Sequence, residues 1–136
     1  MTLDLTFRAE RPSQEAFEDV LRASELGERR PMDDPARMAG MLANANLVVG
    51  AWEGDLLVGV ARSLTDWVWN TYLADLAVRE SHQHLGIGRR LVDETVAACR
   101  PGCRVILLAA PAARGYYAKL GFEQHPSAWM LIPDRP

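Results

Sequence analysis

Polar and apolar residues alternate at the start of the chain and predict a strand over residues 2–8. Apolar residues then recur at helical spacing over residues 13–26 and, after Pro35, over residues 35–42. Two helices are therefore expected between the first strand and the rest of the sheet.

The remaining apolar runs add further strands and two more helices. They predict strands over residues 47–52, 56–64, 71–78 and 105–109, helices over 87–99 and 112–120, and a last hairpin or two short strands over 122–125 and 129–132. The glycine-bearing link at residues 53–55 indicates an antiparallel hairpin, whereas the strand-helix-strand order around the third helix requires a parallel pair. Residues 105–109 are wholly apolar, as in a strand buried on both faces. We therefore expect an α/β (α+β) fold with a mixed sheet.

Size and charge narrow the class of protein. The chain has 136 residues, 49% hydrophobic and 24% charged, which fits one globular domain over residues 1–136. A formal net charge of -3 argues against nucleic-acid binding. No apolar run approaches the roughly 20 residues of a membrane span, and residues 1–10 lack the pattern of a secretion signal. We expect a cytoplasmic protein with no membrane partner.

The two cysteines do not indicate a metal site. Cys99 and Cys103 have no His or Cys cluster beside them, so a zinc site is not supported. They are expected to be reduced thiols.

Residues 83–90 form a glycine turn between a strand and a helix. A helix N-terminus presents unpaired N–H groups and the positive end of the helix dipole, and Gly86 and Gly88 let the backbone approach an anion closely. Arg89 and Arg90 add positive charge, which suits a pyrophosphate.

Other phosphate loops fit this turn less well. A P-loop needs two glycines five apart followed by Lys and Ser or Thr, and a dinucleotide fingerprint needs a third glycine where this chain has Leu91. The alternative interpretation is that the turn binds no ligand and that both glycines only permit a tight turn between the strand and the helix.

Three motifs lie in the second half of the chain. They are Asp75-Leu76-Ala77-Val78, Gln83-x-x-Gly86-x-Gly88 and Tyr117-Ala118-Lys119-Leu120-Gly121-Phe122. Together they resemble the GNAT superfamily of N-acetyltransferases, whose coenzyme A motif is Gln or Arg, two residues, Gly, one residue, Gly or Ala. The resemblance implies a mixed sheet of six or seven strands flanked by about four helices and splayed between the fourth and fifth strands. Acetyl-CoA would be the acetyl donor and an amine the acceptor.

The resemblance also implies which residues bind acetyl-CoA. They are Leu76, Ala77, Val78, Gln83, His84, Leu85, Gly86, Ile87, Gly88, Arg89 and Tyr117. The Leu76 N–H would stabilise charge on the thioester oxygen, and Tyr117 would protonate the leaving thiolate. Tyr116 is expected to be a core ring. Many relatives carry Asn where this chain has Ala110, so this chain lacks that side-chain contact with the coenzyme A arm.

The general base is less clear from the sequence. Asp75 is the candidate, although strand alternation turns it away from Leu76 and places Tyr72 on the face of Leu76. A water relay is the alternative.

The acceptor site is predicted around three aromatic residues. Trp67, Trp69 and Tyr72 would stack on an aromatic or cationic amine, unless the two tryptophans alternate on a strand and cap the core. Residues 57–66 are similar to a GNAT subgroup that includes plant arylalkylamine acetyltransferases. A polyamine or aminoglycoside site is the alternative, at carboxylates that are otherwise solvated: Asp33, Asp34 and Asp66.

Two other functions stay open. A protein with a GNAT fold can bind acetyl-CoA as a sensor without catalysis. Loss of the proton donor would indicate such a sensor, but this chain retains Tyr117. A protein acetyltransferase would act on lysines or N-termini through an open groove. The C-terminal strands offer a surface for a homodimer, with Trp129 and Met130 as apolar contacts.

Overall fold

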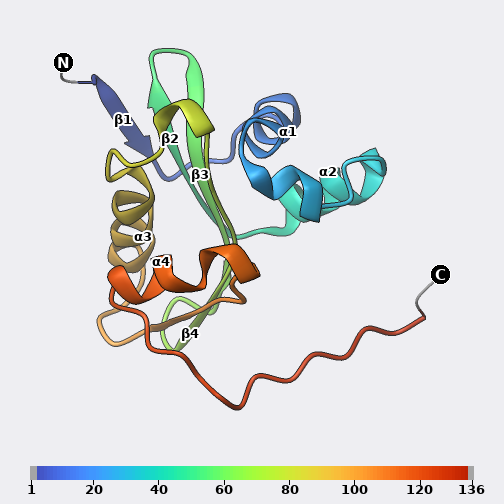
Figure 1. The fold of residues 1–136 in the computed structure, drawn as a ribbon, viewed down its shortest axis with the longest axis vertical. Helices are drawn as coiled ribbons and strands as arrows, with labels where there is room; N and C mark the ends of the chain where they lie inside the picture. The colour runs from blue at the N-terminus through green and yellow to red at the C-terminus, as the bar shows by residue number, and fades with distance from the viewer. Residues whose placement is uncertain (1–2, 135–136) are drawn as a thin grey trace.

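A computed structural model describes residues 3–134 and places a five-stranded sheet between helices on its two faces (Figure 1). The elements are β1 (Leu5–Arg8), α1 (Gln14–Ala23), α2 (Pro35–Asn44), β2 (Leu47–Glu53), β3 (Leu56–Thr65), β4 (Asn70–Val78), α3 (Ile87–Ala97), β5 (Arg104–Ile106) and α4 (Arg114–Lys119). Short 3₁₀ helices lie at Glu25–Arg29, Glu80–His82 and Pro111–Ala113. No helix of the described residues is long and apolar enough to cross a membrane.

The strands lie in the order β1-β2-β3-β4-β5. The first four are antiparallel to their neighbours and β5 is parallel to β4, so the expected mixed sheet is confirmed. The number of strands differs from the six or seven expected, because residues 122–125 and 129–132 form no strand. A strand needs a neighbouring strand to pair its backbone groups, and these segments pair with none in the described part of the chain.

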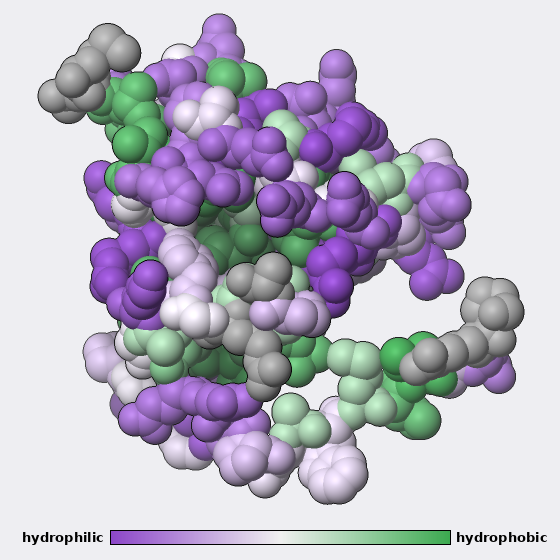
Figure 2. All heavy atoms as spheres, in the orientation of Figure 1, coloured by the Kyte–Doolittle hydropathy of each residue, from purple (hydrophilic) through white to green (hydrophobic). Residues whose placement is uncertain are grey.

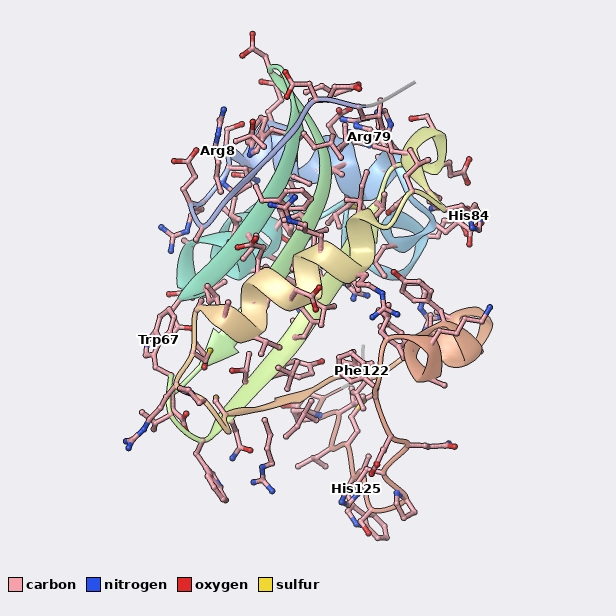
Figure 3. The ribbon with its side chains drawn as sticks, turned by 90° about the vertical axis from the view of Figure 1, so that its left-hand side faces the viewer. Arg8, Trp67, Arg79, His84, Phe122 and His125 are labelled. Carbon is pink, nitrogen blue, oxygen red and sulfur yellow. The ribbon has the colours of Figure 1, made fainter. Side chains whose placement is uncertain are left out.

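Apolar side chains fill both faces of the sheet. One cluster lies under α1 and α2 and includes Phe17, Val20, Leu21, Met38, Leu42, Val48, Leu57, Val60 and Ala77. The other lies under α3 and includes Leu47, Val49, Val58, Ala61, Leu73, Ile87, Leu91 and Val92. Figure 3 shows α3 crossing the sheet, with His84 near its first turn and Trp67 near its other end.

A bulge in β4 changes which residues share a face. Ala74 is an extra residue opposite the step from Arg62 to Ser63 in β3. One extra residue shifts the alternation. Tyr72 and Asp75 therefore face α1 and α2, and Leu76 packs into the cluster under α3. The expectation that Tyr72 and Leu76 share a face is wrong, because it assumed an unbroken alternation.

The strand and helix near the C-terminal end are shorter than expected. The predicted strand at residues 105–109 is reduced to Arg104–Ile106, and the predicted helix at residues 112–120 is a 3₁₀ turn followed by α4. The expectation that this strand is buried on both faces is also wrong, since Ile106 and Leu108 are each 50% exposed. β5 is the edge of the sheet in the described residues, so its outer side has no covering strand.

Candidate active site

The glycine turn stands at the N-terminus of α3, where the sequence placed it. Gly86 is the N-cap residue, with a φ of 82°, and no side chain caps the helix. His84 also has a positive φ, 65°. Because α3 begins at Ile87, the N–H groups of its first turn have no acceptor within the helix. A Cβ added at Gly86 would meet nothing within 4 Å, so the positive φ rather than a lack of space favours glycine there.

Helix α4 docks against this turn through two contacts. The Tyr116 hydroxyl lies too close to the position of a Cβ on Gly88 for both to fit, so a larger residue at position 88 would displace that hydroxyl. The Arg89 guanidinium donates a hydrogen bond of 2.6 Å to the Lys119 carbonyl oxygen. Tyr116 is 41% exposed and is therefore not the core ring that was expected. Its hydroxyl instead lies against Gly88 in the first turn of α3.

Tyr117 is half-buried on α4. Its ring makes edge contacts with Tyr116 and Phe122, with ring centroids 5.4 and 5.7 Å apart. Burial raises the pKa of the Tyr117 phenol above its usual 10.0, the neighbouring Tyr116 adds to the rise, and the positive charge of Arg30 opposes it. The phenol is therefore protonated at neutral pH and can donate a proton.

The sheet splays between β4 and β5, as the resemblance implied. The two strands pair only at the start of β4, where Asn70, Thr71 and Tyr72 lie opposite β5. Residues 73–78 have no β5 partner in the described chain, so this edge of β4 is open and contains Leu76, Ala77 and Val78. The Gln83 amide donates to the Val78 carbonyl oxygen at 3.0 Å and ties the glycine turn to the end of the open strand.

Two arginines bind Asp75, the candidate base. Arg30 Nε donates to one carboxylate oxygen at 2.6 Å and Arg62 Nε to the other at 2.5 Å. The Asp75 side chain is fully buried between them. The second arm of Arg30 donates to the Ala74 carbonyl oxygen at 3.0 Å, and Arg62 donates to the Met41 carbonyl oxygen at 3.2 Å. With both oxygens occupied, Asp75 fixes the β4 bulge to the helices and is not placed as a free base.

The sequence did not point to Arg30 or Arg62. Arg62 carries a weak signal, because a charge inside an apolar strand run needs a buried partner. Arg30 carries none, since it reaches Asp75 across 45 residues of sequence.

The three predicted acceptor residues lie on two different parts of the chain, a loop and a strand. Trp67 and Trp69 lie in the loop between β3 and β4, so they do not alternate on a strand. The Arg104 guanidinium stacks on Trp69 at 4.5 Å from its ring centroid. Tyr72 is 42% exposed on β4, on the face of α1 and α2.

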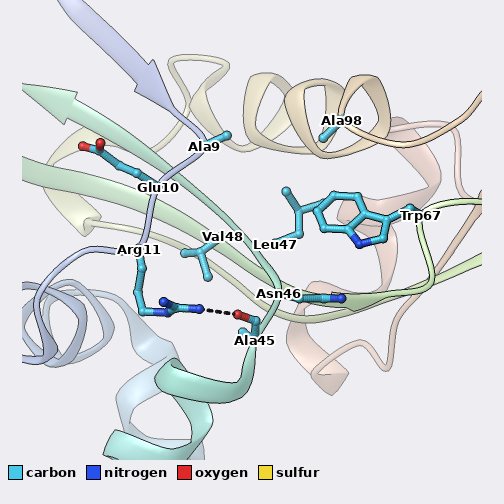
Figure 4. A pocket seen from close by; sticks show the side chains of 9 residues that line it. All are labelled: Ala9, Glu10, Arg11, Ala45, Asn46, Leu47, Val48, Trp67 and Ala98. Carbon is cyan, nitrogen blue, oxygen red and sulfur yellow. Dashed lines mark hydrogen bonds between the residues drawn. The ribbon is translucent and has the colours of Figure 1, made fainter.

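Trp67 belongs to a separate pocket. It lines a hollow of about 330 Å³ at the C-terminal end of α3, with Ala98 and Leu47 beside it (Figure 4). The length of α3, roughly 15 Å at 1.5 Å per residue, separates this pocket from the glycine turn. The structure thus places Trp67 at the end of α3 opposite to Tyr116 and Gly88.

Two of the aspartates considered for a cationic acceptor have structural contacts. Asp34 caps α2 by accepting from the Arg37 N–H at 3.0 Å. Asp66 accepts three backbone N–H groups of its own loop. Among residues 3–134, no three His, Cys, Asp or Glu side chains are grouped so that they would hold a metal ion.

Comparison with known proteins agrees with this geometry. A profile of the Acetyltransferase (GNAT) family matches residues 12–122, so the chain belongs to this family. Serotonin N-acetyltransferase 2, chloroplastic, of Oryza sativa subsp. japonica is 37% identical over 73 residues, 52% of this chain and 36% of the rice protein. An uncharacterized ycf52-like N-acetyltransferase of Prochlorococcus marinus is 30% identical over 104 residues, 72% of this chain and 56% of that protein. The chain spans about a third and about half of these two relatives.

A solved structure shares the fold over almost its whole length. The aminoglycoside N-acetyltransferase AAC(6')-Iy in complex with CoA superposes with a TM-score of 0.74 at 16% identity, covering 99% of this chain and 98% of that one. At this identity the likeness concerns the fold.

Proposed function

We propose that this protein is an acetyl-CoA-dependent N-acetyltransferase that acts on a small primary amine by direct attack. The observation that carries the proposal is the open edge of β4, whose end is tied by Gln83 to the uncapped N-terminus of α3. Tyr117 on α4 adds a protonated phenol. Membership of the GNAT family, and a relative of the same fold in complex with CoA, support it.

The donor would be held by backbone groups more than by side chains. The N–H groups of residues 84–89 and the dipole of α3 suit a pyrophosphate. Apart from the Val78 carbonyl oxygen, which Gln83 binds, the N–H and C=O groups on the open edge of β4 suit the amides of a pantetheine arm. Bound acetyl-CoA would supply the thioester.

Leu76 and Tyr117 would act on the reacting atoms. The Leu76 N–H, two residues after the bulge, is proposed to stabilise charge on the carbonyl oxygen during attack. The amine nitrogen would form the new bond to the acetyl carbon as the carbon–sulfur bond breaks. Tyr117 would give its proton to the leaving sulfur and regain one from water, while the proton lost by the amine would reach solvent through water.

The acceptor is proposed to be a small arylalkylamine or similar primary amine. Serotonin acetylation is in the name of the rice relative, which supports this class. A polyamine or aminoglycoside acceptor has less support in this chain, because Asp34 and Asp66 already bind backbone N–H groups. The cytoplasmic location expected from the sequence stays a prediction.

The test combines calorimetry with acetyl-CoA and amine-dependent release of free thiol. Tyr117→Phe is expected to keep the affinity for acetyl-CoA and to lower kcat by about 100-fold or more, because it removes the proton donor. Tyr116→Phe is the matched control on the adjacent residue and is expected to keep kcat within a few-fold.

Three other outcomes of these measurements would contradict the proposal. Tight binding without turnover on arylalkylamines, polyamines or lysine peptides would favour a sensor. Turnover on lysine peptides alone would favour a protein acetyltransferase. No binding of acetyl-CoA would reject the donor site itself.

A further inference from the structure

The two cysteine side chains meet at one buried hydroxyl group. The Thr71 hydroxyl oxygen lies 3.5 Å from the Cys99 sulfur and 3.4 Å from the Cys103 sulfur. Thr71 is fully buried on β4, whereas both cysteines are partly exposed and carry free thiols. Because both thiols contact the same oxygen atom, their side chains converge instead of pointing apart, as a disulfide requires.

A tight turn brings the two cysteines to this hydroxyl group. The Cys103 N–H donates to the Arg100 carbonyl oxygen at 3.0 Å, so the four residues from Arg100 to Cys103 form a turn. Pro101 is its second residue and Gly102 its third, with a φ of 90°, which is the pattern of a type II turn. Cys99 lies just after α3 and Cys103 directly before β5, so the turn joins these two elements.

Backbone hydrogen bonds to the loop between β3 and β4 hold both sides of this turn. The Arg100 N–H donates to the Trp67 carbonyl oxygen, and the Arg104 N–H donates to the Trp69 carbonyl oxygen, each at 2.9 Å. Each of these arginines directly follows a cysteine in the sequence, so the backbone beside both thiols is fixed. Groups that are already ordered lose less conformational entropy when a bond joins them. The fold therefore favours a bond between these two thiols.

We propose that Cys99 and Cys103 form a reversible disulfide when hydrogen peroxide oxidises the protein, and that this bond ties the end of α3 to the start of β5. One sulfur attacks a peroxide oxygen, the oxygen–oxygen bond breaks, and a sulfenic acid and water form. The other sulfur then attacks the sulfenic sulfur, which forms the sulfur–sulfur bond and releases a second water. The two sulfurs together lose two electrons to the peroxide, and the thiol protons leave in the water. This proposal does not depend on the acetyl transfer proposed above.

Mass spectrometry of the oxidised full chain is the first test. Trypsin does not cleave the Arg100–Pro101 bond, because proline follows the arginine, so residues 91–104 are released as one peptide that contains both cysteines. After treatment with hydrogen peroxide and alkylation of the remaining thiols, this peptide is expected to lack two hydrogen atoms and to carry no alkyl group. Dithiothreitol is expected to restore both thiols, because thiol–disulfide exchange reverses the oxidation.

Peroxide also oxidises exposed methionines, and this reaction provides an internal control. Met130 is 66% exposed in the segment after α4, where Figure 2 shows apolar side chains near the outer end of the chain. Methionine sulfoxide adds an oxygen atom to the peptide that contains Met130, whereas residues 91–104 include no methionine. Oxidation of Met130 therefore shows that the peroxide treatment was effective, and the loss of hydrogen from residues 91–104 reports the disulfide.

The second test asks whether the bond ties the two elements together. Cys99→Ser and Cys103→Ser are the matched controls, because each leaves one thiol and cannot form the internal disulfide. Oxidation is expected to raise the Tm of the wild type by about 5 °C, because the bond restricts the unfolded chain, and to give no such rise in either variant. Both thiols intact after Met130 is fully oxidised, disulfides only between copies, or an unchanged wild-type Tm would each overturn the proposal.

Discussion

At both ends of α3 the chain adopts the left-handed backbone, at His84 and Gly86 before the helix and at Trp67 and Gly102 near its end. Before the helix, the N–H groups are open and no side chain caps them. At the other end the groups are occupied: Asp66 accepts three loop N–H groups, and the Trp67 carbonyl oxygen accepts from the Arg100 N–H at 2.9 Å.

This difference separates a binding site from a structural one. An unusual backbone conformation by itself marks either function or local packing. Open hydrogen-bonding groups beside it favour a ligand, whereas occupied groups favour a role in holding the fold. The same distinction applies to Asp75, whose two oxygens are both occupied.

The largest expected effect follows from removing the Asp75 charge. Asp75→Asn leaves two arginines without their buried partner, so the free energy of unfolding should fall by about 3–5 kcal/mol. Urea denaturation measures it. Glu94→Gln is the control, because its pair with Arg90 is exposed and should contribute less than about 1 kcal/mol. A variant that stays as stable as the wild type but loses acetyl transfer would make Asp75 the base after all.

The open end of α3 is tested at Gly88. Gly88→Ala places a methyl group against the Tyr116 hydroxyl, which must shift beside the proposed anion site, so acetyl-CoA should bind about 10- to 100-fold more weakly. Calorimetry measures the affinity. Stability should not fall, because alanine favours a helix more than glycine by about 1 kcal/mol.

A second substitution tests whether displacement of the Tyr116 hydroxyl causes the weaker binding. Tyr116→Phe removes the hydroxyl, so combining it with Gly88→Ala should restore most of the affinity. If the double variant binds as weakly as Gly88→Ala alone, the contact with Tyr116 is not the cause.

Local sequence patterns predicted the glycine turn correctly. The features that they did not predict depend on pairing between strands. Gly86 and Gly88 stand between a strand and a helix, and sequence spacing alone shows that arrangement. The bulge at Ala74 depends on the register between β3 and β4, which no single strand encodes. It is also why Tyr72 was assigned to the wrong face.

The C-terminal part was predicted less well for a related reason. Residues 129–132 have the composition of a strand, but composition does not say which edge receives it. Likewise, Trp67 and Trp69 fit a strand by alternation, while the turn formed by Asp66 takes them out of it.

A smaller effect, on thermal stability, is expected at Asp66, in the loop near the C-terminal end of α3. Asp66→Ala removes the acceptor of three N–H groups, so Tm at neutral pH should fall while the affinity for acetyl-CoA is unchanged. These hydrogen bonds, the one from Trp69 foremost, lower the pKa of Asp66 below its usual 3.8. The stabilisation by the Asp66 carboxylate is thus fully present above the usual pKa and is lost as the pH falls through the lowered pKa of the folded protein. The Tm values of the wild type and of Asp66→Ala should therefore converge in acid.

Asp55 provides the control for this measurement. It lies in the exposed turn between β2 and β3, so Asp55→Ala should leave Tm nearly unchanged at either pH. A Tm difference for Asp66→Ala that persists in strong acid would show that its charge is not the source.

The smallest expected effect is at Trp67, whose ring lines the pocket at the far end of α3. Trp67→Ala should leave the KM for the amine within about twofold, because the ring lies about one helix length from the proposed donor site. Steady-state kinetics with a saturating acetyl-CoA concentration measure this, and Tyr72→Ala, on the strand nearer to that site, is the comparison. If the KM rises tenfold for Trp67→Ala and not for Tyr72→Ala, the acceptor binds at the C-terminal end of α3. Open or occupied hydrogen-bonding groups would then not distinguish a binding site from a structural one.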